Sequence, residues 1–368
     1  MIYLDYGATS FHKPDAVHRA VSAAMKLCAN PGRGGYCAAM AAAEQVYRCR
    51  ETAGKLFHCS PEQVVFTSNC TQGLNMAINS LIKPGDRVLI SGFEHNAVVR
   101  PLYARGITPI VAGRRLFDPE DTRNAWERAL QTGVDAAVFT HVSNVFGYVL
   151  PVKEMSRLCR EYGVPFILDA AQSAGSIPVN LEALGADFIA MPGHKGLLGP
   201  QGTGLLLCSR GVKPFLYGGT GNHSQSKEMP EELPERGEAG TLNVPGIAGL
   251  EAGMRYLLKN GVERIGRRER AACAMAVEAL ARQGYRVFAG ESQGGTVSVC
   301  PPSDCEDVAA ALARRGIAVR AGLHCAPLAH ESAGTLKTGT LRISFGWDAS
   351  PWQVQKLVES VIIVNREK

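Results

Sequence analysis

The sequence predicts an α/β fold in which helices cover both faces of a mainly parallel sheet. Apolar strand-like segments alternate with amphipathic helical segments through most of the 368 residues, which is the pattern of a parallel sheet covered on both faces. Each predicted strand ends in a short polar or glycine-rich turn, where open α/β sheets bind their ligands. At about 150 residues per domain, the length favours two domains.

The chain up to residue 208 supplies the strands of this sheet and the helices that connect them. Short apolar runs predict strands, and apolar residues spaced three or four apart predict helices. On these patterns, helices are expected at residues 14–27, 38–57 and 71–82. Strands are expected at residues 64–67, 87–91, 136–140, 164–169, 188–191 and 204–208.

A change of composition at residues 213–245 separates this part from the C-terminal part. The segment is rich in Gly, Pro, Glu and Ser, which predicts long loops of a kind that is usually functional or mobile. We therefore expect a large domain at residues 15–246 and a smaller α+β domain formed by residues 1–14 and 247–368. In the smaller domain, helices are expected at residues 247–259, 262–282, 305–315 and 351–364, and strands at 296–300 and 340–344.

Composition and charge argue against several classes of function. The net charge of +5 comes from 39 basic and 34 acidic residues, and no basic block with interleaved aromatic residues indicates a nucleic-acid partner. No apolar run reaches the ~18 residues of a membrane span, and the N-terminus lacks the pattern of a signal peptide. The 11 cysteines are then expected as reduced thiols, and their spacing predicts no metal site. These observations together predict a cytoplasmic protein.

Asp169 and Lys195 are the most informative residues of the sequence. Asp169 ends one apolar run and Lys195 follows the next, so both are expected at the ends of neighbouring strands. Pyridoxal phosphate (PLP) needs such a pair, because the lysine forms a Schiff base and the carboxylate keeps the pyridinium nitrogen protonated. Either residue alone is more simply interpreted as a helix cap or a solvated lysine. The two motifs in this order favour a PLP site.

Polar residues at other predicted strand ends extend this cofactor site. Cys70 and Thr71 lie where a strand leads into a helix, and helix N-termini bind phosphate, although an ordinary helix cap has the same pattern. His95 follows another strand and is expected to stack on the pyridine ring and to handle protons. Asn144 and Gln172 are expected to hydrogen-bond the phenolic oxygen of the ring, and Asn144 is expected to contact the substrate as well.

Cys325 is the candidate nucleophile. It lies on a predicted loop beside His324 and Arg320, and nearby positive charge together with access to solvent lowers the pKa of a thiol. The alternative for any one of the 11 cysteines is an inert, half-buried thiol. Arg342, in the strand predicted at 340–344, is expected to clamp a substrate carboxylate, the alternative being a surface arginine.

Together these segments resemble the class V aminotransferase group of PLP enzymes, and within it the cysteine desulfurase and selenocysteine lyase branch. The motifs that carry the resemblance span nearly the whole chain. They are Tyr3-Leu-Asp-Tyr-Gly-Ala-Thr9, Asp169-Ala-Ala-Gln172, Gly193-His-Lys195, Glu238-Ala-Gly-Thr241, Arg320-Ala-Gly-Leu-His-Cys325-Ala and Leu341-Arg-Ile-Ser344. The resemblance implies PLP fold type I, with a seven-stranded, mainly parallel sheet in the large domain and a smaller α+β C-terminal domain.

The resemblance also implies an activity and roles for individual residues. Lys195 would hold PLP and take the Cα proton of L-cysteine, whose carboxylate would bind Arg342. Cys325 would accept the substrate sulfur as a persulfide and leave L-alanine as the second product. The sulfur would then pass to an acceptor protein or be reduced to sulfide.

A homodimer with shared active sites is implied as well. Thr241, together with Gly240, would reach the phosphate of the partner's cofactor. Arg33 matches a basic position on the substrate side of the site.

Two positions depart from the family pattern. Pro192 stands two residues before the His-Lys pair, where the family commonly has a hydroxyl that binds phosphate. Phosphate binding would then rely more on Thr71, His194 and Thr241. Leu323 replaces the first histidine of a His-His-Cys run.

Three other functions stay open at the level of sequence. A selenocysteine lyase would use the same site with less dependence on Cys325, because selenocysteine ionises more readily than cysteine. Another class V enzyme, an aminotransferase or epimerase, would release no sulfide. A PLP-binding scaffold or regulator would have no physical need for the complete set of Lys195, Asp169 and Cys325. The sequence therefore favours a PLP-dependent cysteine desulfurase over these three alternatives.

Overall fold

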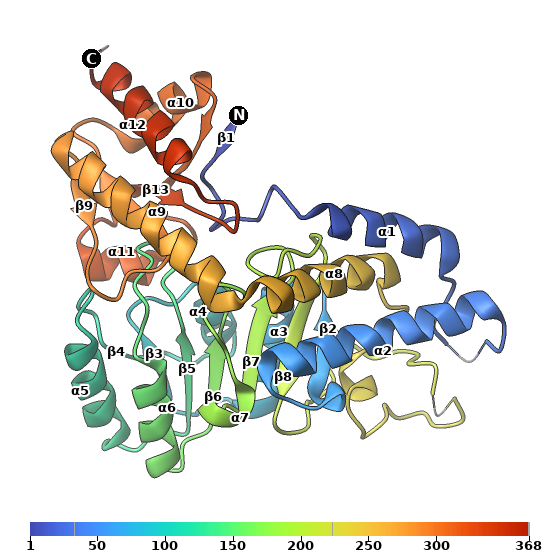
Figure 1. Ribbon diagram of the computed structural model, residues 1–368. Coiled ribbons are helices and arrows are strands. Elements are labelled where there is room, and N and C mark those ends of the chain that lie inside the picture. Colours follow the sequence, from blue (N-terminus) through green and yellow to red (C-terminus); the bar gives the residue numbers. More distant parts are fainter. Residues whose placement is uncertain (33, 223, 367–368) are drawn as a thin grey trace.

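The large sheet of the computed structural model has seven strands in the order β2-β8-β7-β6-β5-β3-β4 (Figure 1). The structure describes residues 1–32, 34–222 and 224–366. Neighbouring strands pair in parallel except β8, which runs antiparallel to β2 and β7. The predicted α/β fold with a mainly parallel sheet is confirmed. The strands are β2 (Val64–Thr67), β3 (Val88–Ser91), β4 (Ile110–Ala112), β5 (Ala136–Thr140), β6 (Phe166–Asp169), β7 (Phe188–Pro192) and β8 (Gly204–Cys208).

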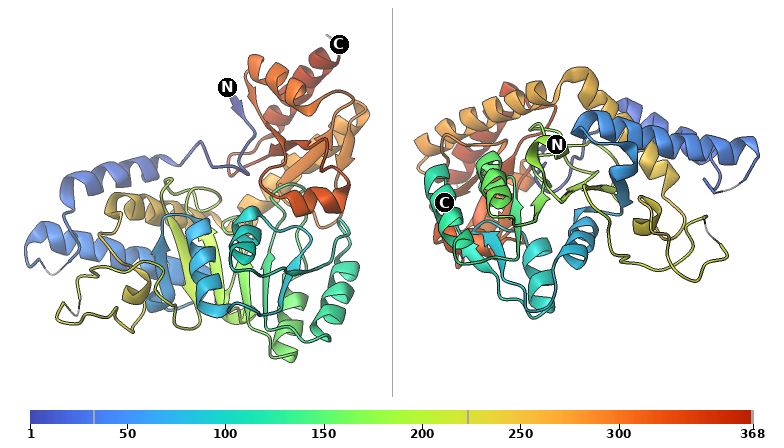
Figure 2. Two further views of the ribbon diagram at one scale, coloured as in Figure 1. Left: turned by 180° about the vertical axis from the view of Figure 1, so that it is seen from behind. Right: turned by 90° about the horizontal axis from the view of Figure 1, so that it is seen from below.

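Each face of this sheet packs into its own apolar cluster. On β6, Phe166 and Leu168 belong to one cluster and Ile167 to the other, as expected when successive side chains of a strand point to opposite faces. The helices on one face are α3 (Cys70–Leu81) and α4 (Asn96–Ala104) (Figure 2). Those on the other face are α2 (Cys37–Phe57), α5 (Pro119–Leu130), α6 (Val152–Glu161), α7 (Leu181–Leu184) and α8 (Val244–Asn260).

The C-terminal part forms a smaller antiparallel sheet in the order β12-β13-β10-β9. A separate apolar cluster fills the space between this sheet and three helices, so the small sheet has its own core. Its strands are β9 (Arg286–Phe288), β10 (Thr296–Cys300), β12 (Arg320–Gly322) and β13 (Thr340–Ser344). The three helices are α9 (Val262–Arg282), α10 (Cys305–Arg314) and α12 (Pro351–Arg366), while the short α11 (Pro327–Ala333) packs against the large cluster.

The N-terminal segment joins the two sheets. Its first strand, β1 (Ile2–Tyr3), pairs in parallel with β11 (Ile317–Ala318) beside the small sheet. The chain then crosses to the large sheet, where the Ser10 N–H donates to the His194 carbonyl at 2.9 Å. It continues into α1 (Asp15–Leu27), which packs against α8 (Figure 2). Residues 1–14 therefore contact both parts of the molecule.

Most predicted elements are confirmed, and the missed ones include short or interrupted elements as well as the helices α5 and α6. The strand β4 has three residues and is largely half-buried, and α4 contains Pro101, a residue that normally ends helices. The helix α6 was not predicted, although Val152, Met155 and Cys159 have helical spacing and are buried. The domain division at residue 246 stays a prediction. It divides α8, which packs on α1 and α2.

A buried ion pair holds Glu238, near the end of the long loops that precede α8, against the large sheet. Arg50 of α2 donates to both carboxylate oxygens of Glu238, at 3.0 and 2.6 Å. Glu238 also accepts the Phe66 N–H at 2.6 Å, and the two charged side chains are only 8% and 6% exposed. Glu238, part of a motif that carried the family resemblance, therefore has a structural role. Among the described residues, no helix combines the length and apolar character needed to cross a membrane.

We expect Glu238→Ala to lower the free energy of unfolding by about 3–5 kcal/mol, because it leaves the Arg50 charge buried without its partner. Urea denaturation followed by circular dichroism measures the loss. Glu44→Ala is the matched control, since Glu44 forms an exposed pair with Arg48 at 3.8 Å and its removal should cost no more than about 0.5 kcal/mol. Equal losses in the two variants would contradict the prediction.

Candidate functional site

A pocket at the ends of the large sheet's strands collects eight of the predicted site residues. These eight are Cys70, Thr71, His95, Asn144, Asp169, Gln172, His194 and Lys195. The strands β6 and β7 are parallel neighbours, so the residues that follow them emerge side by side. The sequence-based expectation that Asp169 and Lys195 lie close together is therefore met.

Asp169 ends β6 and is almost fully buried. One of its carboxylate oxygens, Oδ1, accepts the Ala171 N–H at 2.8 Å and the Cys70 thiol at 3.5 Å. Burial raises the pKa of Asp169, and the Ala171 N–H and the Lys195 charge oppose that shift. The other oxygen makes no hydrogen bond with the described residues, so it is available to a ligand in the pocket.

Lys195 lies on the loop that follows β7 and lines the same pocket. Burial, and then the charge of Arg342, lowers the pKa of the Lys195 amine, while Asp169 acts in the opposite direction. A lowered pKa increases the fraction of neutral amine, which is the nucleophilic form of lysine.

His95 and His194 are neutral residues on the walls of the pocket. Burial and the Lys195 charge lower the pKa of each to about 4. His95 caps α4, and its Nδ1 accepts the Ala97 N–H at 3.0 Å, so the proton of the ring is on Nε2. The Nδ1 of His194 lies 3.0 Å from the hydroxyl of Thr9 in the N-terminal segment.

Of the other residues predicted to contact the cofactor or the substrate, some line this pocket and others do not. Thr71 stands exposed in the first turn of α3, at the helix N-terminus, as expected for an anion site. Gln172 donates its side-chain N–H to the Gly7 carbonyl at 2.9 Å. Thr241 is exposed and lines other hollows of the surface instead of this pocket. Arg33 lies outside the described residues.

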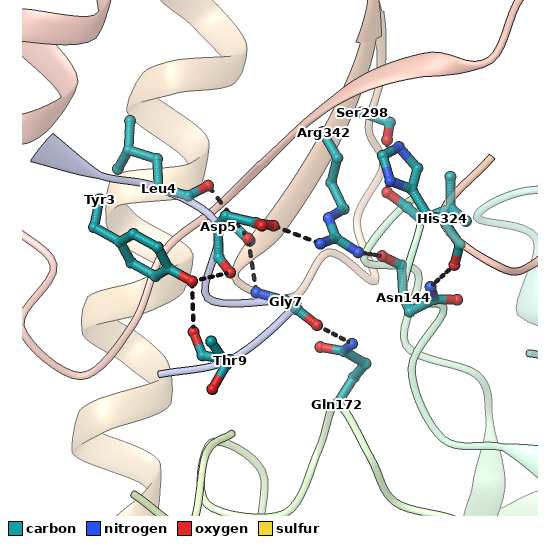
Figure 3. Close-up of polar contacts among 12 residues, drawn as sticks. Tyr3, Leu4, Asp5, Gly7, Thr9, Asn144, Gln172, Ser298, His324 and Arg342 are labelled. Atoms are coloured by element: carbon teal, nitrogen blue, oxygen red, sulfur yellow. Dashed lines mark hydrogen bonds and ion pairs between the residues drawn. The ribbon is translucent and has the colours of Figure 1, made fainter. Parts of the chain in front are cut away.

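Arg342 of β13 is a buried residue with protein partners. Its side chain is 2% exposed, and its Nη2 donates to Asp5 Oδ1 at 2.6 Å (Figure 3). Its Nη1 donates to the Asn144 carbonyl at 3.0 Å, and its Nε is buried without a hydrogen-bond partner among the described residues. The alternative of a surface arginine is excluded.

Cys325 lies exposed at the tip of a tight turn. His324 and Cys325 have φ angles of 49° and 57°, in the left-handed region that non-glycine residues rarely adopt. The turn is held by three hydrogen bonds to its main-chain oxygens. They run from Ala326 N to Leu323 O at 3.0 Å, from Asn144 Nδ2 to His324 O at 2.7 Å and from Asn96 N to Cys325 O at 2.8 Å.

The expectation that His324 places positive charge beside Cys325 is wrong. The His324 ring points into the protein, where its Nε2 lies 3.2 Å from the Thr340 carbonyl. Burial, and then the charge of Arg342, lowers the pKa of His324 to about 2, so the ring is neutral at neutral pH. Of the two residues that the sequence offered as positive neighbours, only Arg320 is charged.

Asp5 is the residue of the site that sequence reasoning missed. It is the ion-pair partner of Arg342, although 337 positions separate the two in the chain. Its only signal was its place in the motif at residues 3–9, which matched the family without indicating a role. The pairing depends on the parallel bridge between Asp5 and Ser344, which local sequence does not encode.

Comparison with known proteins places the chain in one family. The family model described as "Aminotransferase class-V" matches residues 2–357. A "Probable cysteine desulfurase" of Methanothermobacter thermautotrophicus is 33% identical and covers 98% of this chain and 94% of its own. The apo structure of a cysteine desulfurase from Thermococcus onnurineus NA1 superposes with a TM-score of 0.91 at 30% identity, covering 100% of this chain and 95% of that chain. A cysteine desulfurase of Escherichia coli, solved in an S-sulfonic acid form, gives a TM-score of 0.86 at 27% identity over 99% of this chain and 94% of that chain.

The buried neutral histidines predict that stability decreases on acidification. His324 has a pKa of about 2 in the folded protein against an ordinary value of 6.5, so below pH 6.5 the unfolded chain binds a proton that the folded chain does not. Stability is therefore lost as the pH falls from 6.5 toward 2, by about 1.4 kcal/mol per pH unit for this residue. Burial raises the pKa values of Glu94 and Glu269 to about 8, and these groups act in the opposite direction, so the contribution of His324 is measured as a difference between two proteins. Urea denaturation of the wild type and of His324→Gln at pH 7.5, 6 and 5 should show that the wild type loses stability relative to the variant as the pH falls, and identical pH dependence in the two proteins would contradict this origin.

Proposed function

Because the chain belongs to the aminotransferase class-V family, we propose that it acts as a cysteine desulfurase that transfers sulfur to Cys325. The observation that carries this proposal is an exposed cysteine on a turn that is hydrogen-bonded to Asn144, a residue of the pocket of Asp169 and Lys195. Asn144 connects the two places, because it lines the pocket and donates to the carbonyl of the residue before Cys325. A class V enzyme with incidental cysteines has no need of that arrangement.

The pocket residues fit PLP, the cofactor that the family implies. Asp169 has a carboxylate oxygen without a partner among the described residues, and it would pair with the pyridine nitrogen. The Lys195 amine has a lowered pKa, as covalent attachment of a carbonyl group requires. The neutral ring of His95 would stack on the pyridine, and Thr71 at the N-terminus of α3 would bind the phosphate. Pro192 lines the pocket without a hydroxyl, so His194 and a Thr241 from a partner subunit would supply the other phosphate contacts.

The side chains around the pocket divide the reaction between them. Bound PLP supplies the electron sink that makes the Cα proton of L-cysteine acidic. Arg342 orients the substrate carboxylate, Lys195 takes and returns the proton, and His95 is the second group that handles protons. The sulfur of Cys325 then attacks the substrate sulfur. The C–S bond of L-cysteine breaks, an S–S bond forms on Cys325, and the carbon takes up a proton to give L-alanine.

The surface around Cys325 suits a second protein. Leu323, which replaces a histidine of the family motif, is 39% exposed beside the exposed thiol. An apolar rim next to a persulfide allows an acceptor protein to dock and present its own thiol. We propose a cytoplasmic location, supported by the 11 cysteines, which are free thiols as in a reducing compartment.

A homodimer is part of the proposal. Tyr36, Met40 and Tyr47 on and beside α2 expose 51–61% of their surfaces, and Tyr217 on the long loops exposes 79%. Large exposed apolar side chains gathered on one part of a protein mark an interface. Thr241 shares a surface hollow with Tyr47, so dimerisation through this region would cover Thr241.

The test of the function is the product balance. We expect the PLP-loaded protein, given L-cysteine and a reductant, to release equimolar alanine and sulfide. Cys325→Ala should lose sulfide release, whereas Cys37→Ala, which removes the other exposed thiol, should keep it. Sulfide at the wild-type rate from Cys325→Ala would remove Cys325 from the mechanism. Absence of sulfide from every form would overturn the desulfurase assignment.

The shared site predicts complementation between two inactive variants. If Thr241 serves the partner's cofactor, a mixed dimer of Lys195→Ala and Thr241→Asp subunits contains one complete site. That site combines the intact Lys195 of the Thr241→Asp subunit with the intact Thr241 of the Lys195→Ala subunit. Mixing the two variants after mild dissociation should then restore up to about a quarter of the wild-type rate, because half of the dimers are mixed and each has one of two sites. Activity no higher than that of the separate variants would place Thr241 in its own subunit's site.

A further inference from the structure

The carboxylate-binding side of the site and the cysteine turn are two ends of one chain of hydrogen bonds (Figure 3). The chain begins at Asp5, which pairs with Arg342 at 2.6 Å. Arg342 donates to the main-chain carbonyl of Asn144 at 3.0 Å. The side chain of the same Asn144 donates to the carbonyl of His324 at 2.7 Å. One residue therefore contacts the arginine through its main chain and the turn of Cys325 through its side chain.

The contact from Asn144 is the one side-chain hydrogen bond among the three that hold the main-chain oxygens of this turn. The other two come from the main-chain N–H groups of Ala326 and Asn96. Two successive residues in the left-handed region are costly, and they persist only where surrounding contacts hold them. The conformation that presents Cys325 depends accordingly on the side chain of Asn144.

The free oxygen of Asn144 makes this residue responsive to a ligand. Asn144 is 9% exposed, its Oδ1 is buried without a hydrogen-bond partner among the described residues, and it lines the pocket with Lys195. A buried amide oxygen without a donor is unfavourable, so a donor arriving in the pocket is drawn to it. A carboxylate that binds Arg342 likewise competes with the Asn144 carbonyl for Nη1. Both events act on the residue that holds the turn.

We propose that Asn144 is a positioning residue that couples occupation of the Arg342 carboxylate site to the conformation of the Cys325 turn. The proposal rests on the proposed function for the identity of the ligand, an α-amino acid, and for the role of Cys325. It adds that binding of the substrate carboxylate and presentation of the sulfur-accepting thiol are linked through one amide side chain. This link between carboxylate binding and the Cys325 turn depends on hydrogen bonds within the protein, so it can be measured in the absence of catalytic turnover.

The reporters are the amide protons of Ala326 and Asn96, which bond to the turn. Hydrogen exchange of the PLP-loaded wild type is followed by mass spectrometry, alone, with L-alanine, and with ethylamine, which is alanine without its carboxylate. We expect L-alanine to change the exchange of these two amides and ethylamine to leave it unchanged. In Asn144→Ala, we expect exchange to be about 5- to 100-fold faster, the effect of losing one buried hydrogen bond. L-alanine should no longer alter it.

Two further variants keep the test decisive. Asn144→Asp has the same shape but no donor for the His324 carbonyl, so it should show the same rapid exchange if Asn144→Ala fails to fold. Asn260→Ala removes an amide side chain that donates to the Tyr256 carbonyl in α8, outside the lining of the pocket, and should retain the wild-type response to L-alanine. Wild-type exchange in both Asn144 variants, or a persisting response to L-alanine in them, would overturn the proposal. A response to L-alanine in a protein that releases no sulfide would overturn the desulfurase assignment and leave the coupling standing.

Discussion

The buried guanidinium of Arg342 is the constraint on which the junction of the two sheets depends. A charge that is 2% exposed is tolerated only when it is paired and hydrogen-bonded. Asp5 supplies the opposite charge, and this brings the N-terminal segment to the small sheet. Asn144 supplies a carbonyl, and this ties the loop after β5 to the same point. Gly7 approaches the same point closely, since a Cβ at that position would lie 3.1 Å from the guanidinium carbon.

The same desolvation acts on the other charged groups of the site. It raises the pKa of Asp169 and lowers the pKa of Lys195, His95 and His324. Each shift moves the group toward its neutral form, which lowers the cost of burying it. Neutral Lys195 is the nucleophilic form of the amine, and a cofactor with an anionic phosphate and a cationic ring nitrogen would find complementary partners. The burial that removes these groups from water therefore also prepares their chemistry.

Sequence reasoning located the cofactor side of the site because local patterns determine it. Apolar runs mark where β6 and β7 end, and parallel neighbouring strands bring Asp169 and the loop of Lys195 together. The carboxylate side depends on contacts across 337 positions and on a domain junction, so the Asp5–Arg342 pair had no local signal. His324 was placed correctly beside Cys325, yet its charge was mispredicted because burial is a property of the folded chain and not of its neighbours in sequence.

The contrast between Lys195 and Cys325 explains why the two are arranged at different depths. In the proposed reaction, proton transfer at Cα would be best served by a lysine that is partly withdrawn from water, whereas a persulfide on Cys325 would have to be reached by a second protein or a reductant. A single buried site cannot meet both needs, because a sulfur carried inside the pocket would be inaccessible to its acceptor. An exposed turn is compatible with both needs: the left-handed backbone of His324 and Cys325 directs the histidine ring inward and leaves the thiol exposed. In the proposed coupling, accurate positioning of the thiol depends on the amide of Asn144, which lines the pocket and donates to the carbonyl of His324.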